Sequence, residues 1–278
     1  MIEHVTQAKG LGKRLTCRVL GFRRQTYYSR KQGRRPEELD AYIADLLHQI
    51  TKRFLPWGFW MVFHYLRRQG HTWNHKRIYR IWKQEQLHLR QPVKRSRIKR
   101  KYLDLQAPDH INEGWGVDFV SDWIVGPNQE KVRIINIIDE HSRKALWTQA
   151  YSSISAKVLI GVLDLVLKWR GCPAYIRCDN GPEFISEQLK EWAQDKGITL
   201  RYIQPGKPSQ NGIIERLNGT LRTECLNLEW FQNMEVLNEK IQEWSVVYNT
   251  LRPHSSIGYL TPDELEQAKP DLYFKAVA

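Results

Sequence analysis

The sequence predicts an α/β protein with a mixed five-stranded sheet, preceded by a small, basic, all-helical domain. Apolar residues recur at helical spacing before about residue 90, and β-rich segments alternating with helices begin at residue 114. Charge changes between the two parts. Residues 1–100 hold 24 Lys and Arg against 6 Asp and Glu, a balance of +18, whereas residues 101–278 hold 19 against 24, a balance of −5.

Composition excludes several classes of protein. A hydrophobic content of 41% with 11 Trp indicates a folded chain. No apolar run is long enough to cross a membrane, and the first residues, MIEHVTQAKGLGKR, lack the apolar core of a signal peptide, so we expect a cytoplasmic protein. Four scattered cysteines without a CxxC pair indicate neither a disulfide framework nor a zinc ribbon.

The basic first half predicts a polyanionic partner, with nucleic acid the first candidate. A solubilising surface or attraction to anionic membrane would give the same charge. The chain shows no amphipathic anchor or lipidation motif, which favours nucleic acid.

Residues 13–31 predict two short helices hinged at Gly21, in the outline of a helix-turn-helix. Apolar residues of this stretch would pack inward, and its arginines would face outward. The inward set is Val19, Leu20 and Phe22, and the candidate DNA contacts are Arg23, Arg24 and Arg30. Any small basic helical hairpin would show this pattern, so contact with a DNA groove stays one of two interpretations.

A second group of helices follows from Ala41, with Ile43, Leu47 and Ile50 at helical spacing. We expect two further helices at about 60–69 and 75–87. Asn74 would cap the last helix, whose basic face is either a DNA contact or a solvated surface. Its candidate DNA-binding residues are Lys76, Arg77 and Arg80, and those of the charged run that follows are Lys94, Arg95, Lys99 and Arg100.

These patterns predict four parts of the chain. They are a basic helix-turn-helix-like segment at 1–35, a helical DNA-binding domain at 36–90, a basic linker at 91–109 and a sheet-containing core at 110–278. In the core we expect strands at 114–125, 131–151 (two strands turning at Glu140–Ser142), 175–179 and 199–204, and helices at 155–170, 182–196, 211–226 and 234–250. Hairpins followed by strands with crossover helices imply a mixed sheet.

Three carboxylates of the core are candidates for one site. Asp118 interrupts a strand in which Trp115, Val117 and Phe119 share a face, and Asp179 ends another strand before an Asn-Gly turn. Glu215 lies on a helix face opposite the aliphatic residues. Each carboxylate alone has an ordinary structural explanation. Together they supply only oxygen ligands, which suit two Mg²⁺ or Mn²⁺ ions about 3.5–4 Å apart for in-line displacement at phosphorus.

Longer motifs identify a family that the chain resembles. They are DF at Asp118, IDEHSR at 138–143, RCDNGPEF at 177–184, IQPGKPSQNGIIERLNGTLRTECLN at 203–227 and YNTLRPHSSIGYLTP at 248–262. In these motifs the chain is similar to the second-frame (OrfB) transposases of insertion-sequence family three, which belong to the DDE superfamily with a retroviral-integrase-like core. Asp179 and Glu215 have 35 residues between them, and Arg222 follows Glu215 by seven positions, as in that family.

The resemblance implies an RNase H-like fold and a metal-binding catalytic triad of Asp118, Asp179 and Glu215, with Arg222 on terminal DNA. It implies that one element strand is cut and that its 3′-OH attacks the flank of the other end, giving a circular intermediate that later integrates. The implied partners are the double-stranded DNA of the terminal repeats and the target, further copies of the chain on DNA, and an upstream-frame (OrfA) product or a fusion with it. The expected location is the bacterial nucleoid, with no membrane association.

Two other classes of function stay open from the sequence. A DNA-binding regulator without catalysis would not need the three carboxylates. A plain RNase H-like nuclease would hydrolyse DNA without joining strands, whereas the basic first half and Arg222 favour a protein that holds DNA ends through several steps.

Overall fold

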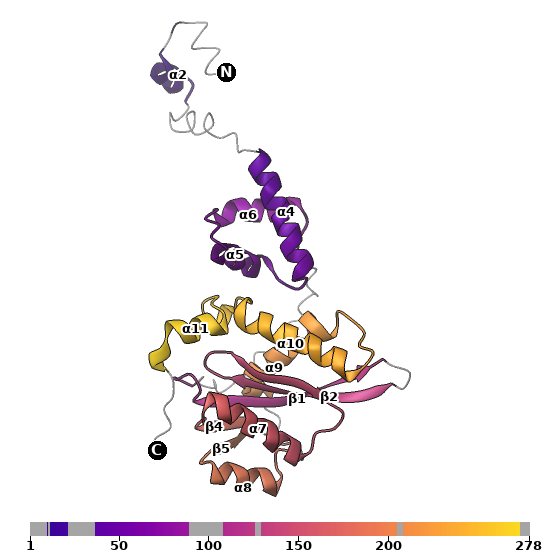
Figure 1. Ribbon diagram of the computed structural model, residues 1–278. Helices are drawn as coiled ribbons and strands as arrows, with labels where there is room; N and C mark the ends of the chain where they lie inside the picture. The colour runs from indigo at the N-terminus through magenta and orange to yellow at the C-terminus, as the bar shows by residue number, and fades with distance from the viewer. Residues whose placement is uncertain are drawn as a thin grey trace. The chain divides into compact units, whose positions relative to one another are not determined.

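The computed structural model describes residues 10, 12–21, 37–88, 108–125, 129–204 and 208–272 (Figure 1). Contacts divide the chain into two compact units. The described helices of the first are α2 (Lys13–Val19), α4 (Glu37–Arg53) and α6 (His75–Gln84), and α5 (Phe59–Arg68) belongs to the second. No helix in the described ranges is long and apolar enough to cross a membrane.

The first unit shows the helical periodicity predicted for it. Ile43, Leu47 and Ile50 of α4 are buried, and the Asn74 side chain caps α6 by accepting a hydrogen bond from the Lys76 backbone N–H at 2.9 Å. The prediction for α2 was partly wrong, because Val19 is 69% exposed and Thr16 and Cys17 are the buried residues of that helix. The second helix expected at its end lies outside the described residues.

The second unit contains the predicted mixed sheet of five strands, in the order β3-β2-β1-β4-β5. The strands are β1 (Gly114–Ile124), β2 (Glu130–Asp139), β3 (Ala145–Tyr151), β4 (Tyr175–Cys178) and β5 (Thr199–Tyr202). Strands β1, β2 and β3 pair antiparallel, and β4 and β5 extend the sheet in parallel. The remaining helices are α7 (Ala156–Arg170), α8 (Glu187–Asp195), α9 (Gly212–Leu221), α10 (Met234–Thr250) and α11 (Pro262–Ala268).

Helices cover both faces of the sheet (Figure 1). Odd-numbered residues of β1, such as Trp115 and Val117, pack into a core with α7 and α8. Even-numbered ones, such as Val120, pack with α9 and α10. The period of two along a strand therefore assigns Asp118 to the face that α9 covers.

The helix expected at 182–196 begins later than predicted, at Glu187. The Ser186 side chain caps it by accepting from the Leu189 N–H, and the Gly181 carbonyl accepts from Phe184 and Ile185 in a separate turn. Pro182 thus lies in that turn and does not begin the helix. The helix expected at 211–226 also departs from the prediction, since α9 ends at Leu221 and a π-helical turn, Arg222–Leu226, follows.

Candidate active site

Asp118 is a half-buried residue in the middle of β1. Its Oδ1 accepts a hydrogen bond from the Phe119 backbone N–H at 2.8 Å, and its Oδ2 accepts one from Asn218 Nδ2 on α9, also at 2.8 Å. An ionised carboxylate offers about four acceptor positions, so both oxygens keep capacity for a ligand.

Asp179 follows the last residue of β4, the parallel neighbour of β1. Its Oδ1 accepts from the Gly181 backbone N–H at 2.8 Å, which is the short-range contact expected of Asp in a turn. A Cβ at position 181 would lie 2.9 Å from that oxygen, so glycine gives the carboxylate the space it occupies. The turn therefore holds the carboxylate at the end of the strand.

Glu215 lies in the first turn of α9. This helix packs Ile214, Leu217 and Leu221 into the core, which leaves Glu215 exposed on the other side. The partial positive charge of a helix N-terminus favours a carboxylate at this position.

The negative charges of Asp179 and Glu215 both act on Asp118. Burial, together with the negative charges of Asp179 and Glu215, raises the pKa of Asp118 to about 6, although the hydrogen bonds from Phe119 and Asn218 act in the opposite direction. Such a concentration of negative charge fits a site for hard cations.

The carboxylates are not arranged as a closed ligand set. Within the described ranges, no group of three His, Cys, Asp or Glu side chains is close enough together to hold one metal ion. Asp118 accepts from protein N–H groups at both of its oxygens, and Asp179 accepts from one at Oδ1. The chemistry of the donors fits Mg²⁺ or Mn²⁺, because all are carboxylate oxygens on a partly exposed surface.

A neighbouring amide was missed from the sequence. Asn136 of β2 lies opposite Asp118 in the strand register, is fully buried, and donates from Nδ2 to Asn218 Oδ1 at 2.7 Å. The available signal was the segment VRIINIID, since Asn is a poor strand former among isoleucines.

Arg222 is exposed at the start of the π-helical turn, where its Nη2 donates to the carbonyl oxygen of Ser121 on β1 at 2.8 Å. Irregular helical turns of this kind occur often at functional sites. The turn begins one residue after α9 ends, so Glu215 and Arg222 share one continuous helical segment.

The other predicted DNA contacts divide into three groups. Lys76 is exposed on α6. Arg77 and Arg80 both pair with Asp40 of α4, Arg77 through Nε to Oδ1 at 2.7 Å and Arg80 to Oδ2. The remaining residues lie outside the described part of the chain: Arg23, Arg24, Arg30, Lys94, Arg95, Lys99 and Arg100.

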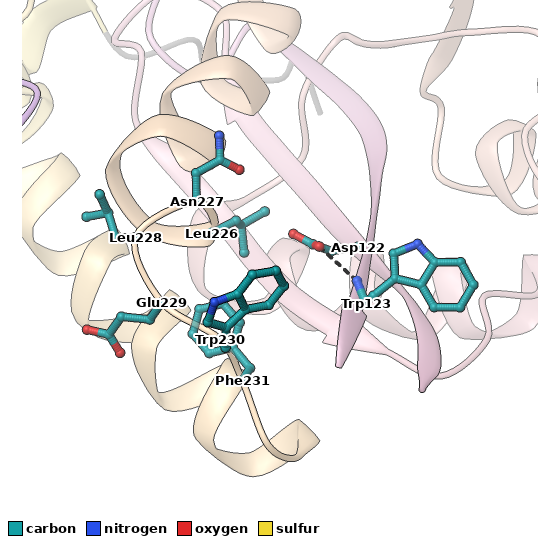
Figure 2. A pocket seen from close by; sticks show the side chains of 8 residues that line it. All are labelled: Asp122, Trp123, Leu226, Asn227, Leu228, Glu229, Trp230 and Phe231. Carbon is teal, nitrogen blue, oxygen red and sulfur yellow. Dashed lines mark hydrogen bonds between the residues drawn. The ribbon is translucent and has the colours of Figure 1, made fainter. Parts of the chain in front are cut away.

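A pocket of about 340 Å³ lies at the far end of β1 (Figure 2). It is lined by Asp122, Trp123, Leu226, Asn227, Leu228, Glu229, Trp230 and Phe231. None of the three candidate carboxylates lines this pocket, so the candidate active site is not this cavity.

Comparisons with known proteins agree with this architecture. Residues 108–208 and 196–262 match two models of the integrase core domain, and residues 38–95 match an HTH-like domain. The chain is 35% identical to the "Insertion element IS407 uncharacterized 31.7 kDa protein" of Burkholderia multivorans, over 94% of this chain and 92% of that one.

Two further relatives carry related names. The "Insertion element IS476 uncharacterized 39.2 kDa protein" of Xanthomonas euvesicatoria is 33% identical, over 94% of this chain and 73% of its own length. The "Transposase InsD for insertion element IS2A/D/F/H/I/K" of Escherichia coli is 23% identical, over 84% of this chain and 80% of its own length. The identity to the first relative, its coverage of nearly the whole chain and the two domain types place the protein in a family: it belongs to the insertion-element transposases with an integrase core, the OrfB group of insertion-sequence family three.

Proposed function

We propose that this chain cuts the ends of an insertion element and joins the resulting 3′-OH groups to DNA, with Asp118, Asp179 and Glu215 as its catalytic and metal-binding residues. The observation that carries the proposal is the placement of the carboxylates: Asp179 directly follows β4, the parallel neighbour of the strand that carries Asp118, and Glu215 lies on α9, whose Asn218 donates to Asp118. The raised pKa of Asp118, about 6, to which the charges of Asp179 and Glu215 contribute, agrees with this placement. Three acidic side chains that act on one another electrostatically support a site that is neutralised by cations.

Divalent metal ions bound there would supply a polarised phosphoryl oxygen and stabilisation of the attacking and leaving oxygens. Asp118, Asp179 and Glu215 would hold them. In the cutting reaction, water attacks phosphorus, and the bond from phosphorus to the 3′ oxygen of the element strand breaks. In joining, that 3′-OH attacks a second phosphorus, and another 3′ oxygen leaves with the proton.

Arg222 supports the binding of DNA beside this site. Its guanidinium is exposed and uses Nη2 for the Ser121 carbonyl, so other N–H groups remain available for a phosphate of terminal DNA. The HTH-like domain supports double-stranded DNA as the partner. Two ends must be held at once, so we propose a homo-oligomer on DNA, with the upstream-frame product as a further partner.

Strand cleavage and joining test the proposal. The substrates are duplexes with the flanked ends of the element, incubated with the full chain and Mg²⁺. Wild type should give both products, and Glu215→Gln should reduce both by at least about 10³-fold, because a metal ligand is lost. The matched control is Asp122→Asn, which removes a carboxylate from the same strand as Asp118 but outside the triad.

Each alternative function predicts a different result. A plain nuclease would give hydrolysis products and no joined strands. A regulator would bind the ends equally well in wild type and Glu215→Gln while giving no product in either. Equal activity of Glu215→Gln and Asp122→Asn would contradict the assignment of the triad.

A further inference from the structure

Two amide side chains connect the middle of the sheet to Asp118. Asn136 of β2 donates from Nδ2 to Asn218 Oδ1 at 2.7 Å, and Asn218 of α9 donates from Nδ2 to Asp118 Oδ2 at 2.8 Å. The two hydrogen bonds therefore connect β2 through α9 to β1. Asn136 reaches the carboxylate only through Asn218.

The order of donors and acceptors gives this arrangement a direction. A side-chain amide has a donating end and an accepting end, whereas an ionised carboxylate only accepts. Because Asn136 donates to the Asn218 oxygen, the Asn218 NH₂ group faces Asp118. If the Asn218 amide were rotated by 180°, its oxygen would face the carboxylate oxygen of Asp118. Two acceptors would then face each other without a hydrogen bond between them.

The fixed Asn218 amide restrains Asp118 at one oxygen, and the backbone N–H of Phe119 restrains it at the other. The carboxylate is thereby held at both oxygens while each retains a lone pair. Hydrogen bonds of this kind orient metal-ligating carboxylates.

Packing alone does not explain Asn136. It is fully buried, and the neighbouring residues on its side of β2, Ile134 and Ile138, belong to the apolar core under α9 and α10. Its Oδ1 has no hydrogen-bond partner among the described residues. An amide with one unsatisfied end in such a core costs stability, so the benefit must come from the end that is bonded.

We propose that Asn136 is a positioning residue, which holds the Asn218 amide in the orientation that fixes Asp118 for a divalent cation. This inference rests on the proposed function. It adds that a residue without contact to metal or DNA sets the affinity of the site for its cation.

The experiment measures Mn²⁺ binding by the full chain without DNA, from the electron paramagnetic resonance signal of free Mn²⁺ during a titration. The variants are Asn136→Leu, which keeps the branching at Cγ, and Asn136→Val, which is closer to asparagine in volume and suits a strand if leucine prevents folding. The control is Thr148→Val. Thr148 is the partner of Asn136 in the register with β3, is also buried, and its hydroxyl makes no hydrogen bond among the described residues.

Loss of the Asn136 amide should weaken Mn²⁺ binding by about 10-fold or more, as loss of such outer hydrogen bonds does elsewhere. Thr148→Val should bind Mn²⁺ like wild type. In EDTA, the Asn136 variants and Thr148→Val should all bind element-end DNA like wild type. This result separates a loss of positioning from a general loss of structure.

Mn²⁺ affinity of a folded Asn136 variant within twofold of wild type would overturn the inference and leave the proposed function intact. Equal weakening by Thr148→Val would also overturn it, because any change in the core would then suffice. If wild type bound no Mn²⁺, the proposed metal-dependent function would fail, and this inference would fail with it.

Discussion

The guanidinium of Arg222 donates to the carbonyl oxygen of Ser121 at 2.8 Å, and thereby lies against β1, the strand that carries Asp118. On the proposed function this arginine contacts a phosphate of terminal DNA. We therefore predict that Arg222→Gln weakens binding of element ends by about 10-fold, equivalent to about 1.4 kcal/mol. The slope of log affinity against log salt should fall by about one, as measured by fluorescence anisotropy in EDTA.

Lys240→Gln is the matched control for Arg222→Gln, since it removes one positive charge from a partly exposed position on α10. If the two variants lost the same affinity, the effect would come from net charge alone and not from a contact made by Arg222.

The basic face of α6 gives a second prediction about DNA. Lys76 is exposed, whereas Arg77 and Arg80 pair with Asp40. We predict that Lys76→Gln weakens DNA binding about threefold with little change in stability. Arg77→Gln should mainly lower the melting temperature, because it leaves Asp40 with one partner fewer.

Asp40→Asn distinguishes DNA contact from ion pairing as the role of Arg77 and Arg80, because it releases both arginines from Asp40. DNA affinity should rise in this variant and the melting temperature should fall. A fall in DNA affinity with Asp40→Asn would show that the ion pairs themselves shape the DNA-binding surface.

The sequence predicted the order of strands and helices in the core because the local patterns there agree with the tertiary structure. Alternation in β1 separated Trp115 and Val117 from Asp118, and the α9 face with Glu215 followed from helical periodicity. The proximity of Asp118 and Asp179 depends on the parallel pairing of β1 with β4. Glu215 depends instead on α9, which contacts β1 through the hydrogen bond from Asn218 to Asp118.

What could not be predicted depends on individual side-chain hydrogen bonds. The start of α8 is set by Ser186, which competes with Pro182 as a helix start. The two asparagines meet because α9 crosses β1 and β2, and a contact between residues 82 positions apart has no local pattern. The π-helical turn after Leu221 likewise has no periodic signal.

Gly114 gives a prediction for stability. A Cβ at this position would lie 2.1 Å from the ring of Tyr175, whose hydroxyl donates to Glu140 at 2.8 Å. The buried ring cannot move without breaking that bond, so Gly114→Ala should lower the free energy of unfolding by about 3 kcal/mol, as overpacking of a core does.

Gly161→Ala is the control for Gly114→Ala. Gly161 lies inside α7, and a Cβ there would have no atom within 4 Å. Alanine should stabilise the helix by about 0.5–1 kcal/mol. Urea denaturation measures the free energy of unfolding of both variants. If both variants changed it in the same direction, contact of the new Cβ with Tyr175 would not explain the effect of Gly114→Ala.

Glu266 predicts a stability that depends on pH. Burial opposes ionisation of this carboxyl, but the guanidinium of Arg170 and then the ammonium of Lys144 lower the pKa of Glu266 to about 2. The pKa in the unfolded chain is about 4.5, so the contribution to stability is complete above pH 4.5 and is lost as the pH falls from 4.5 towards 2. This difference corresponds to about 3 kcal/mol.

Glu266→Gln should therefore lower the free energy of unfolding by about 3 kcal/mol at pH 7. The difference from wild type should shrink as the pH falls from 4.5 to 3, because wild type then loses the same ion pairs. Urea denaturation at each pH measures this, with Glu243→Gln, an exposed carboxyl paired with Lys240, as a control that should change little. A difference between wild type and Glu266→Gln that stayed constant down to pH 3 would show that Glu266 stabilises the fold by packing and not by its charge.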